Sequence, residues 1–201
     1  MLGLPQSTEV RKPLPKAQLF KRFDWKPSQR DIFDSVVAHL DFIHWISPKT
    51  VPAITEGTDV KEIFVIEVTL KDRDFDMKPI ELLAQSVPQQ VAYLLRYEQE
   101  ARLAVYHTKL FVSAPQDIDS INISLTGLNL DSVWETIVSS IGSFSVEHEN
   151  SLTEQIKIDT DRAKLEKQIA TLEKQMYASK QPRRKRELFE EIKKLKGGLN
   201  V

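Results

Sequence analysis

The fold is decided by residues 62–71, which read Glu-Ile-Phe-Val-Ile-Glu-Val-Thr-Leu-Lys. Successive side chains of an extended strand point to opposite faces, so alternate residues of this stretch share a face. One face is apolar throughout and carries Phe64, Ile66, Val68 and Leu70. The other face begins with Ile63 and Val65 and becomes polar from Glu67 onward. We therefore predict a strand that is buried on both faces at its start and reaches solvent on one face at its end.

A helix and a second strand are expected directly after this stretch. Pro79 suits the first turn of a helix that Pro88 ends, and residues 91–97 have strand character. A strand–helix–strand order implies a right-handed crossover, so the two strands should be parallel. Periodicity predicts the other strands at 42–46, 102–107, 109–113 and 121–125, and two more helices at 29–39 and 131–141. Ser28 and Asp131 are the expected N-caps of those helices.

The composition of the chain changes near residue 148. Nine of the ten prolines lie between Pro5 and Pro115, whereas residues 153–181 contain neither proline nor glycine. The predicted fold class is α+β, with a small mixed β-sheet and three short helices, followed by a C-terminal coiled-coil-like helical arm or hairpin. We divide the chain into an extended N-terminal segment packing on the body, an α+β core domain and a C-terminal helical arm, at 1–27, 28–148 and 152–197.

The arm has an apolar stripe at helical spacing. Its members follow one another at steps of 7, 4, 3 and 4 residues, and they are Ile158, Leu165, Ile169, Leu172 and Met176, of which the last four are the predicted partner-binding residues. After Pro182 the 4, 3 step returns with Leu188, Ile192 and Leu195. Two helices are expected, at about 153–180 and 183–196, either as a hairpin or as a kinked pair. A thin arm buries little surface alone, so we predict that the first stripe binds a partner, a second copy of the chain included.

Missing residue types and motifs exclude several classes of protein. The chain has no cysteine, which excludes disulfides, thiol nucleophiles and thiolate zinc sites. No GxxxxGK[ST], GxGxxG or GxSxG pattern is present, which argues against P-loop hydrolysis, dinucleotide binding and serine hydrolysis. Four histidines lie far apart, although His44 and Asp41 are close in sequence. We expect no metal and no cofactor. No apolar stretch approaches the roughly 18 residues that a membrane-spanning helix needs, so we also expect no membrane contact and a cytoplasmic location.

Charge is unevenly distributed along the chain. Residues 151–201 contain 13 Lys and Arg against 8 Asp and Glu, a surplus of +5, while the first 150 residues contain 15 against 21, a surplus of −6. The densest basic run comprises Lys180, Arg183, Arg184, Lys185 and Arg186. Basic residues at a helix N-terminus oppose the helix dipole, so the run is a candidate for contact with phosphate or an acidic surface. The alternative is a solvated helix start.

A metal-dependent nuclease is the enzymatic hypothesis. Such sites need two carboxylates and a lysine around one metal ion and water. Glu67 and Lys71 share a strand face, but Thr69 holds the position where the lysine is needed, and Asp59 or Asp72 would have to supply the second carboxylate. The alternative is that Glu67 pairs with a cross-strand partner and Lys71 marks the strand's exit.

Three sets of residues resemble a known family. They are Leu4-Pro5-x-Ser7-Thr8-x-Val10 with Leu14-Pro15-Lys16, then Val65-Ile66-x-Val68-x-Leu70-Lys71 with Leu94-Leu95-Arg96-Tyr97, and finally Lys185-x-Glu187-Leu188 with Ile192-Lys193-x-Leu195. The chain is similar in these residues to the bacterial domain-of-unknown-function family 4391. The resemblance implies no assigned activity. It implies proteins often encoded beside helicase-like or DNA-modifying genes in defence-type loci.

The leading hypothesis is therefore a non-catalytic accessory or adaptor subunit of a DNA-associated system. The body would dock on a larger protein, such as a helicase or DNA-modifying enzyme, and the arm would provide a second contact. Direct nucleic-acid binding by the basic arm and the divergent nuclease are the alternatives.

Overall fold

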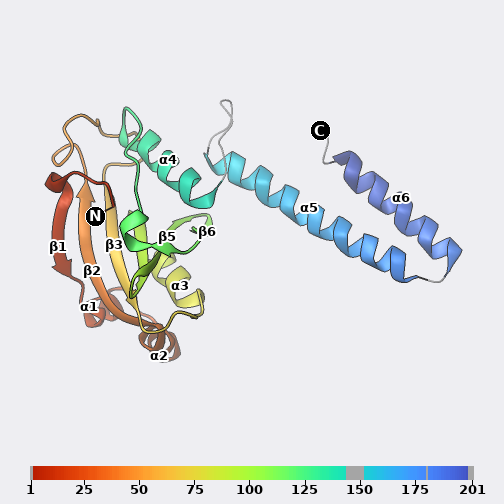
Figure 1. Cartoon of the computed structure of the whole chain (residues 1–201), viewed down its shortest axis with the longest axis horizontal. Coiled ribbons are helices and arrows are strands. Elements are labelled where there is room, and N and C mark those ends of the chain that lie inside the picture. Colours follow the sequence, from red (N-terminus) through yellow and green to blue (C-terminus); the bar gives the residue numbers. More distant parts are fainter. Residues whose placement is uncertain (1, 144–151, 180, 199–201) are drawn as a thin grey trace. The chain divides into compact units, whose positions relative to one another are not determined.

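The chain forms two compact units with a boundary between residues 145 and 146. The computed structural model describes residues 2–143, 152–179 and 181–198. The first unit, the body, contains a mixed sheet and four α-helices among its described residues, and the second consists of two long helices (Figure 1). The predicted α+β class with a C-terminal helical region is confirmed.

The sheet has seven strands. They are β1 (Glu9–Pro13), β2 (Val37–Ile46), β3 (Ile63–Leu70), β4 (Gln90–Tyr97), β5 (Glu100–His107), β6 (Lys109–Val112) and β7 (Gln116–Asp117). The strand order is β1-β2-β3-β4-β5-β6, and β7 pairs with β5. Strands β3 and β4 are parallel, as predicted, because α3 (Lys78–Ser86) connects them in a crossover. The other pairs are antiparallel.

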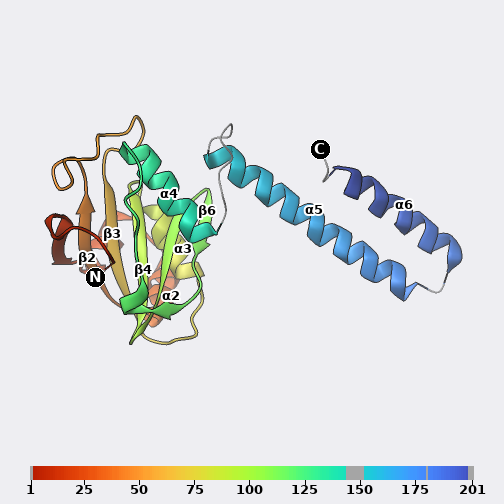
Figure 2. The same cartoon turned by 45° about the horizontal axis from the view of Figure 1, so that its top comes forward.

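The main core lies on one face of this sheet. Alternate residues of β3, among them Ile66 and Val68, pack there against Phe33 of α2 (Pro27–Val36) and Ile80 of α3. The helix α1 (Lys16–Arg22) adds half-buried side chains to the same core. On the opposite face, Leu103 of β5 lies beside side chains of α4 (Leu130–Gly142), and Figure 2 shows α3 and α4 on opposite sides of the sheet. The faces are therefore covered by different helices.

Two predicted N-caps are wrong. The helix α2 begins at Pro27 after its N-cap Lys26, whose backbone N–H donates to Gln29 Oε1 at 2.9 Å, so Ser28 lies inside the helix. The N-cap of α4 is Asn129, because its Oδ1 accepts from the Ser132 N–H at 2.9 Å. Asp131 has another role. Its carboxylate accepts the backbone N–H groups of residues 58–60 and so ties that loop to the start of α4.

Two further predictions differ from the structure. The helix predicted at 29–39 ends at Val36, where β2 begins at once. Residues 121–125 form no strand and contribute an isolated bridge between Asn122 and Leu2. The segment 1–27 supplies β1, which pairs with β2, and α1, a fourth helix of the body.

The second unit is an antiparallel helical hairpin of α5 (Leu152–Ala178) and α6 (Pro182–Gly198). Figures 1 and 2 show α6 lying beside the C-terminal part of α5, and Lys196 Nζ pairs with Glu173 Oε1 at 2.8 Å across the two helices. Of the two arrangements left open by the sequence, the structure has the hairpin. Across the described residues, no helix combines the length and apolarity that crossing a bilayer would require.

Candidate functional site

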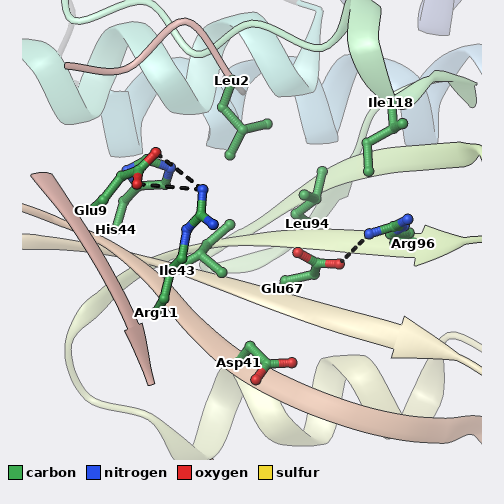
Figure 3. Close-up of a pocket in the computed structure, with 10 residues that line it drawn as sticks. All are labelled: Leu2, Glu9, Arg11, Asp41, Ile43, His44, Glu67, Leu94, Arg96 and Ile118. Carbon is green, nitrogen blue, oxygen red and sulfur yellow. Dashed lines mark hydrogen bonds and ion pairs between the residues drawn. The ribbon is translucent and has the colours of Figure 1, made fainter. Parts of the chain in front are cut away.

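A pocket of about 330 Å³ opens on the face of the sheet opposite the main core (Figure 3). Its walls come from β1, β2, β3, β4, the N-terminal segment and the short 3₁₀ helix η2 (Ile118–Ser120). Six of its side chains carry titratable or charged groups, and they are Glu9, Arg11, Asp41, His44, Glu67 and Arg96. The others are apolar, so the pocket combines a charged rim with an apolar lining, as small-molecule sites commonly do.

The strand register brings Asp41 and Glu67 together. They are directly paired across β2 and β3, and Leu94 of β4 is paired with Glu67 on its other side. Arg96 Nη1 donates to Glu67 Oε1 at 3.1 Å. Asp41 has no hydrogen-bond or ion-pair partner within the described part of the chain, and Figure 3 shows it on β2 away from both arginines. Glu67 therefore has an ion-pair partner, whereas Asp41 has none among the described residues.

Two β-bulges shape the β1–β2 side of the pocket. The register shifts between Phe42 and His44 of β2, and again between Glu9 and Lys12 of β1. The first bulge places both Ile43 and His44 at the pocket, although neighbouring strand residues ordinarily face opposite ways. At the second bulge Arg11 has a φ of 50°, in the left-handed region that non-glycine residues rarely adopt. Its guanidinium pairs with Glu9 at 3.4 Å.

His44 is held in one orientation and is neutral near pH 7. It is only 4% exposed, and its Nδ1 lies 2.8 Å from Thr8 Oγ1. The Thr8 hydroxyl donates to the Pro5 carbonyl at 2.7 Å, so its oxygen accepts from a protonated Nδ1 and Nε2 keeps a free lone pair. Burial lowers the pKa of His44 from its ordinary 6.5, and this outweighs the opposite effect of the Glu9 carboxylate. The ring thus brings a hydrogen-bond acceptor to the pocket.

The structure does not bring Glu67 and Lys71 together. Lys71 Nζ donates to the main-chain carbonyl of Asp34 at the end of α2, and Glu67 pairs with Arg96. Neither Asp59 nor Asp72 lines the pocket. The described residues contain no group of three or more His, Asp or Glu side chains that could hold a metal ion. The arrangement matches the structural alternative, in which Glu67 has a partner on a neighbouring strand and Lys71 lies past the strand's end.

The predicted partner-binding stripe lies in the hairpin. Ile169 is 6% exposed, and Leu165, Leu172 and Met176 are half-buried. From α6, Leu188 and Ile192 are buried as well. These side chains therefore hold the hairpin together, and they are less available to a partner than the exposed apolar side chains of the two helices.

The two helices of the hairpin also expose large apolar side chains. Phe189 of α6 is 54% exposed, Ile158 of α5 is 50% exposed, and Tyr177 at the end of α5 is exposed too. The basic run lies at the start of α6, where Arg183 and Arg184 pair with Glu187 at 3.3 and 3.4 Å. Lys185 and Arg186 are exposed, and Lys180 lies outside the described residues.

Comparison with protein families identifies the family of this chain. Residues 2–199 match the family described as "Domain of unknown function (DUF4391)". The chain belongs to this family. The match covers nearly the whole chain, so the DUF4391 region includes both the body and the hairpin. No curated protein matches the chain, and no solved structure does either.

Sequence analysis identified Glu67 as a candidate site residue, but it did not predict that Asp41, Arg96 and Arg11 line the same pocket. The one available signal was the closeness of Asp41 and His44 in sequence. A regular strand would place residues three apart on opposite faces, and only the bulge at Ile43 brings both to the pocket.

Proposed function

We propose that this DUF4391 protein is a non-catalytic accessory subunit that docks on a larger protein through the α5–α6 hairpin. The observation that carries the proposal is the exposure of Phe189 and Ile158, two large apolar side chains of a thin two-helix unit. Large apolar side chains that a helical surface leaves in solvent are typical anchors of protein interfaces.

The charge of α6 defines the chemistry of the partner surface. Residues 182–198 contain seven Lys and Arg against three Glu, a net charge of +4. Three of these cations are placed three or four residues from Phe189 on the same helix, and they are Lys185, Arg186 and Lys193. An aromatic side chain surrounded by cations complements an apolar pocket with an acidic rim.

A protein surface suits α6 better than a phosphate backbone does. Glu187, Glu190 and Glu191 interrupt the cations of α6, and Glu187 engages Arg183 and Arg184. Carboxylates within a phosphate-binding face would repel the nucleic acid. Because of the family resemblance, our proposal takes the partner to be a helicase or DNA-modifying enzyme of a defence-type system, and the complex to be cytoplasmic.

Affinity purification of the tagged full chain from its native host, with and without nuclease treatment, tests the proposal. We expect a stoichiometric partner that survives nuclease and is lost in Phe189→Asp and Ile158→Asp. Both positions are half-exposed, so these variants leave the hairpin folded, whereas Asp at the buried Ile169 would unfold it. Gln168→Asp is the matched control, since it adds the same charge at an exposed position of α5.

The outcomes separate the hypotheses. Recovery of the chain alone, or of copies of itself, would discard the accessory-subunit reading. Recovery of partners only through nucleic acid would favour direct nucleic-acid binding by the arm.

A further inference from the structure

The pocket on the body has a charge that its own residues do not balance. Its three carboxylates face two guanidinium groups, and Arg11 pairs with Glu9 while Arg96 pairs with Glu67. With His44 neutral, the pocket retains one negative charge, which is on Asp41. An exposed carboxylate would be unremarkable on a flat surface, but this one is half-buried and lines a cavity.

The position of Asp41 is electrostatically unfavourable. Asp41 lies directly opposite Glu67 on the neighbouring antiparallel strand, and like charges in such cross-strand pairs destabilise a sheet. Arg96 reaches Glu67 Oε1 but not Asp41. A cation placed between the two carboxylates would remove the repulsion.

A second acceptor lies in the same pocket. His44 is more than nine-tenths buried, its Nδ1–H is used by Thr8, and its Nε2 has no protein partner among the described residues. An acceptor nitrogen and a free carboxylate in one cavity both require donors from a ligand. The bulge that places Ile43 and His44 together at the pocket holds this acceptor on a rigid strand.

The lining favours an organic cation over a metal ion. Leu2, Leu94 and Ile118 give the pocket an apolar wall, and its volume of about 330 Å³ suits a small organic molecule. Metal ions of the magnesium class need several oxygen ligands at close range, and the described residues offer no group of three metal-ligating side chains.

We propose that this pocket binds a small aliphatic amine, whose ammonium group lies between Asp41 and Glu67 and whose carbon chain lies on the apolar wall. A second donor on the ligand reaches His44 Nε2. This site is independent of the hairpin, so its failure would leave the proposed function untouched.

Titration of the full chain with 1,4-diaminobutane, followed by amide chemical shifts, tests the proposal. We expect saturable shifts in β2, β3 and β4. Butane-1,4-diol has the same length without the charge and should bind at least about tenfold more weakly, as expected for loss of a charge-assisted hydrogen bond. Asp41→Asn should weaken diaminobutane binding by a similar factor. Asp72→Asn, which removes the same charge from an exposed residue past the end of β3, should not.

The stability of the free variant gives a second readout. Asp41→Asn removes the like-charge pair, so the unliganded variant should melt at or above the temperature of the wild type, while the diaminobutane-dependent rise in melting temperature is lost. A lower melting temperature would show that Asp41 has a purely structural role and would overturn the proposal. Equal binding of the diol, unchanged binding by Asp41→Asn, no diaminobutane shifts, or the same shifts with Mg²⁺ alone would also overturn it.

Discussion

Truncation of Phe189 is the sharpest test of the hairpin as a docking surface. A phenylalanine can bury about 200 Å², and with 54% of its surface exposed in the free protein, roughly 110 Å² is available to a partner. At about 25 cal/mol per Å² this area is worth about 2.7 kcal/mol. Since alanine keeps part of the contact, we expect Phe189→Ala to weaken the complex by about 2 kcal/mol, or roughly 30-fold in Kd.

The assay is titration of the purified partner with the full chain, together with circular dichroism to follow helix content. Phe189→Ala should keep the wild-type helix content, because the side chain is on the outside of α6. Two variants of neighbouring residues serve as controls for Phe189→Ala. Glu190→Ala changes the next, exposed residue and should bind no more weakly than the wild type. Leu188→Ala empties a buried position and should cost the hairpin about 2–5 kcal/mol of folding free energy. Wild-type affinity in Phe189→Ala would refute the assignment of this surface.

Three further changes test the body and the basic run. Asp131→Asn should lower the free energy of unfolding by about 1–2 kcal/mol in urea, because an amide offers one acceptor oxygen to the N–H donors of loop 58–60 where the carboxylate offers two. Although burial raises the pKa of Asp131, those N–H donors lower it overall, so the difference should persist above pH 3.8 and vanish as acid protonates the carboxylate. His44→Asn keeps a donor for Thr8 and should remove part of the wild type's acid sensitivity. Because burial lowers the pKa of His44, the unfolded chain binds a proton first, and wild-type stability should fall by up to about 1.4 kcal/mol per pH unit below pH 6.5. Replacing Arg183, Arg184 and Arg186 by Glu should weaken partner capture and flatten its salt dependence; loss of salt-sensitive binding to a DNA duplex instead would favour the nucleic-acid alternative.

Local signals were sufficient for the centre of the sheet. The alternation of residues 62–71 and the two prolines around α3 each allow one interpretation, and the structure has β3, α3 and β4 within a residue or two of the predicted bounds. At the start of β2 the signals conflict, because Val36, Val37 and Leu40 satisfy a helical spacing although the chain is already extended from Val37. There the pairing of Val37 with Leu70 of β3 overrides the local pattern.

The errors at the helix starts have a similar cause. Asn129 and Asp131 both have side chains that can cap a helix, and local sequence does not rank them. The structure uses the carboxylate of Asp131 for three N–H groups in a loop some 70 residues earlier, which leaves Asn129 as the cap. The predicted strand 121–125 failed because its one ladder contact with the described residues is a bridge to Leu2, at the far end of the body's sequence.

The candidate site depends on such distant pairings throughout. The sequence made Glu67 a candidate because of its neighbours along β3. In the structure Glu67 lies opposite Asp41 of β2 and pairs with Arg96 of β4. Each pairing is fixed by register, and a one-residue slip would place every side chain on the other face. The bulge at Ile43 shifts the register of β2 by one residue, and this places His44 at the same pocket as Asp41. A pocket built from register shifts leaves no spacing motif in the sequence, so the absence of a recognisable catalytic motif in this chain does not argue against a ligand site on its sheet.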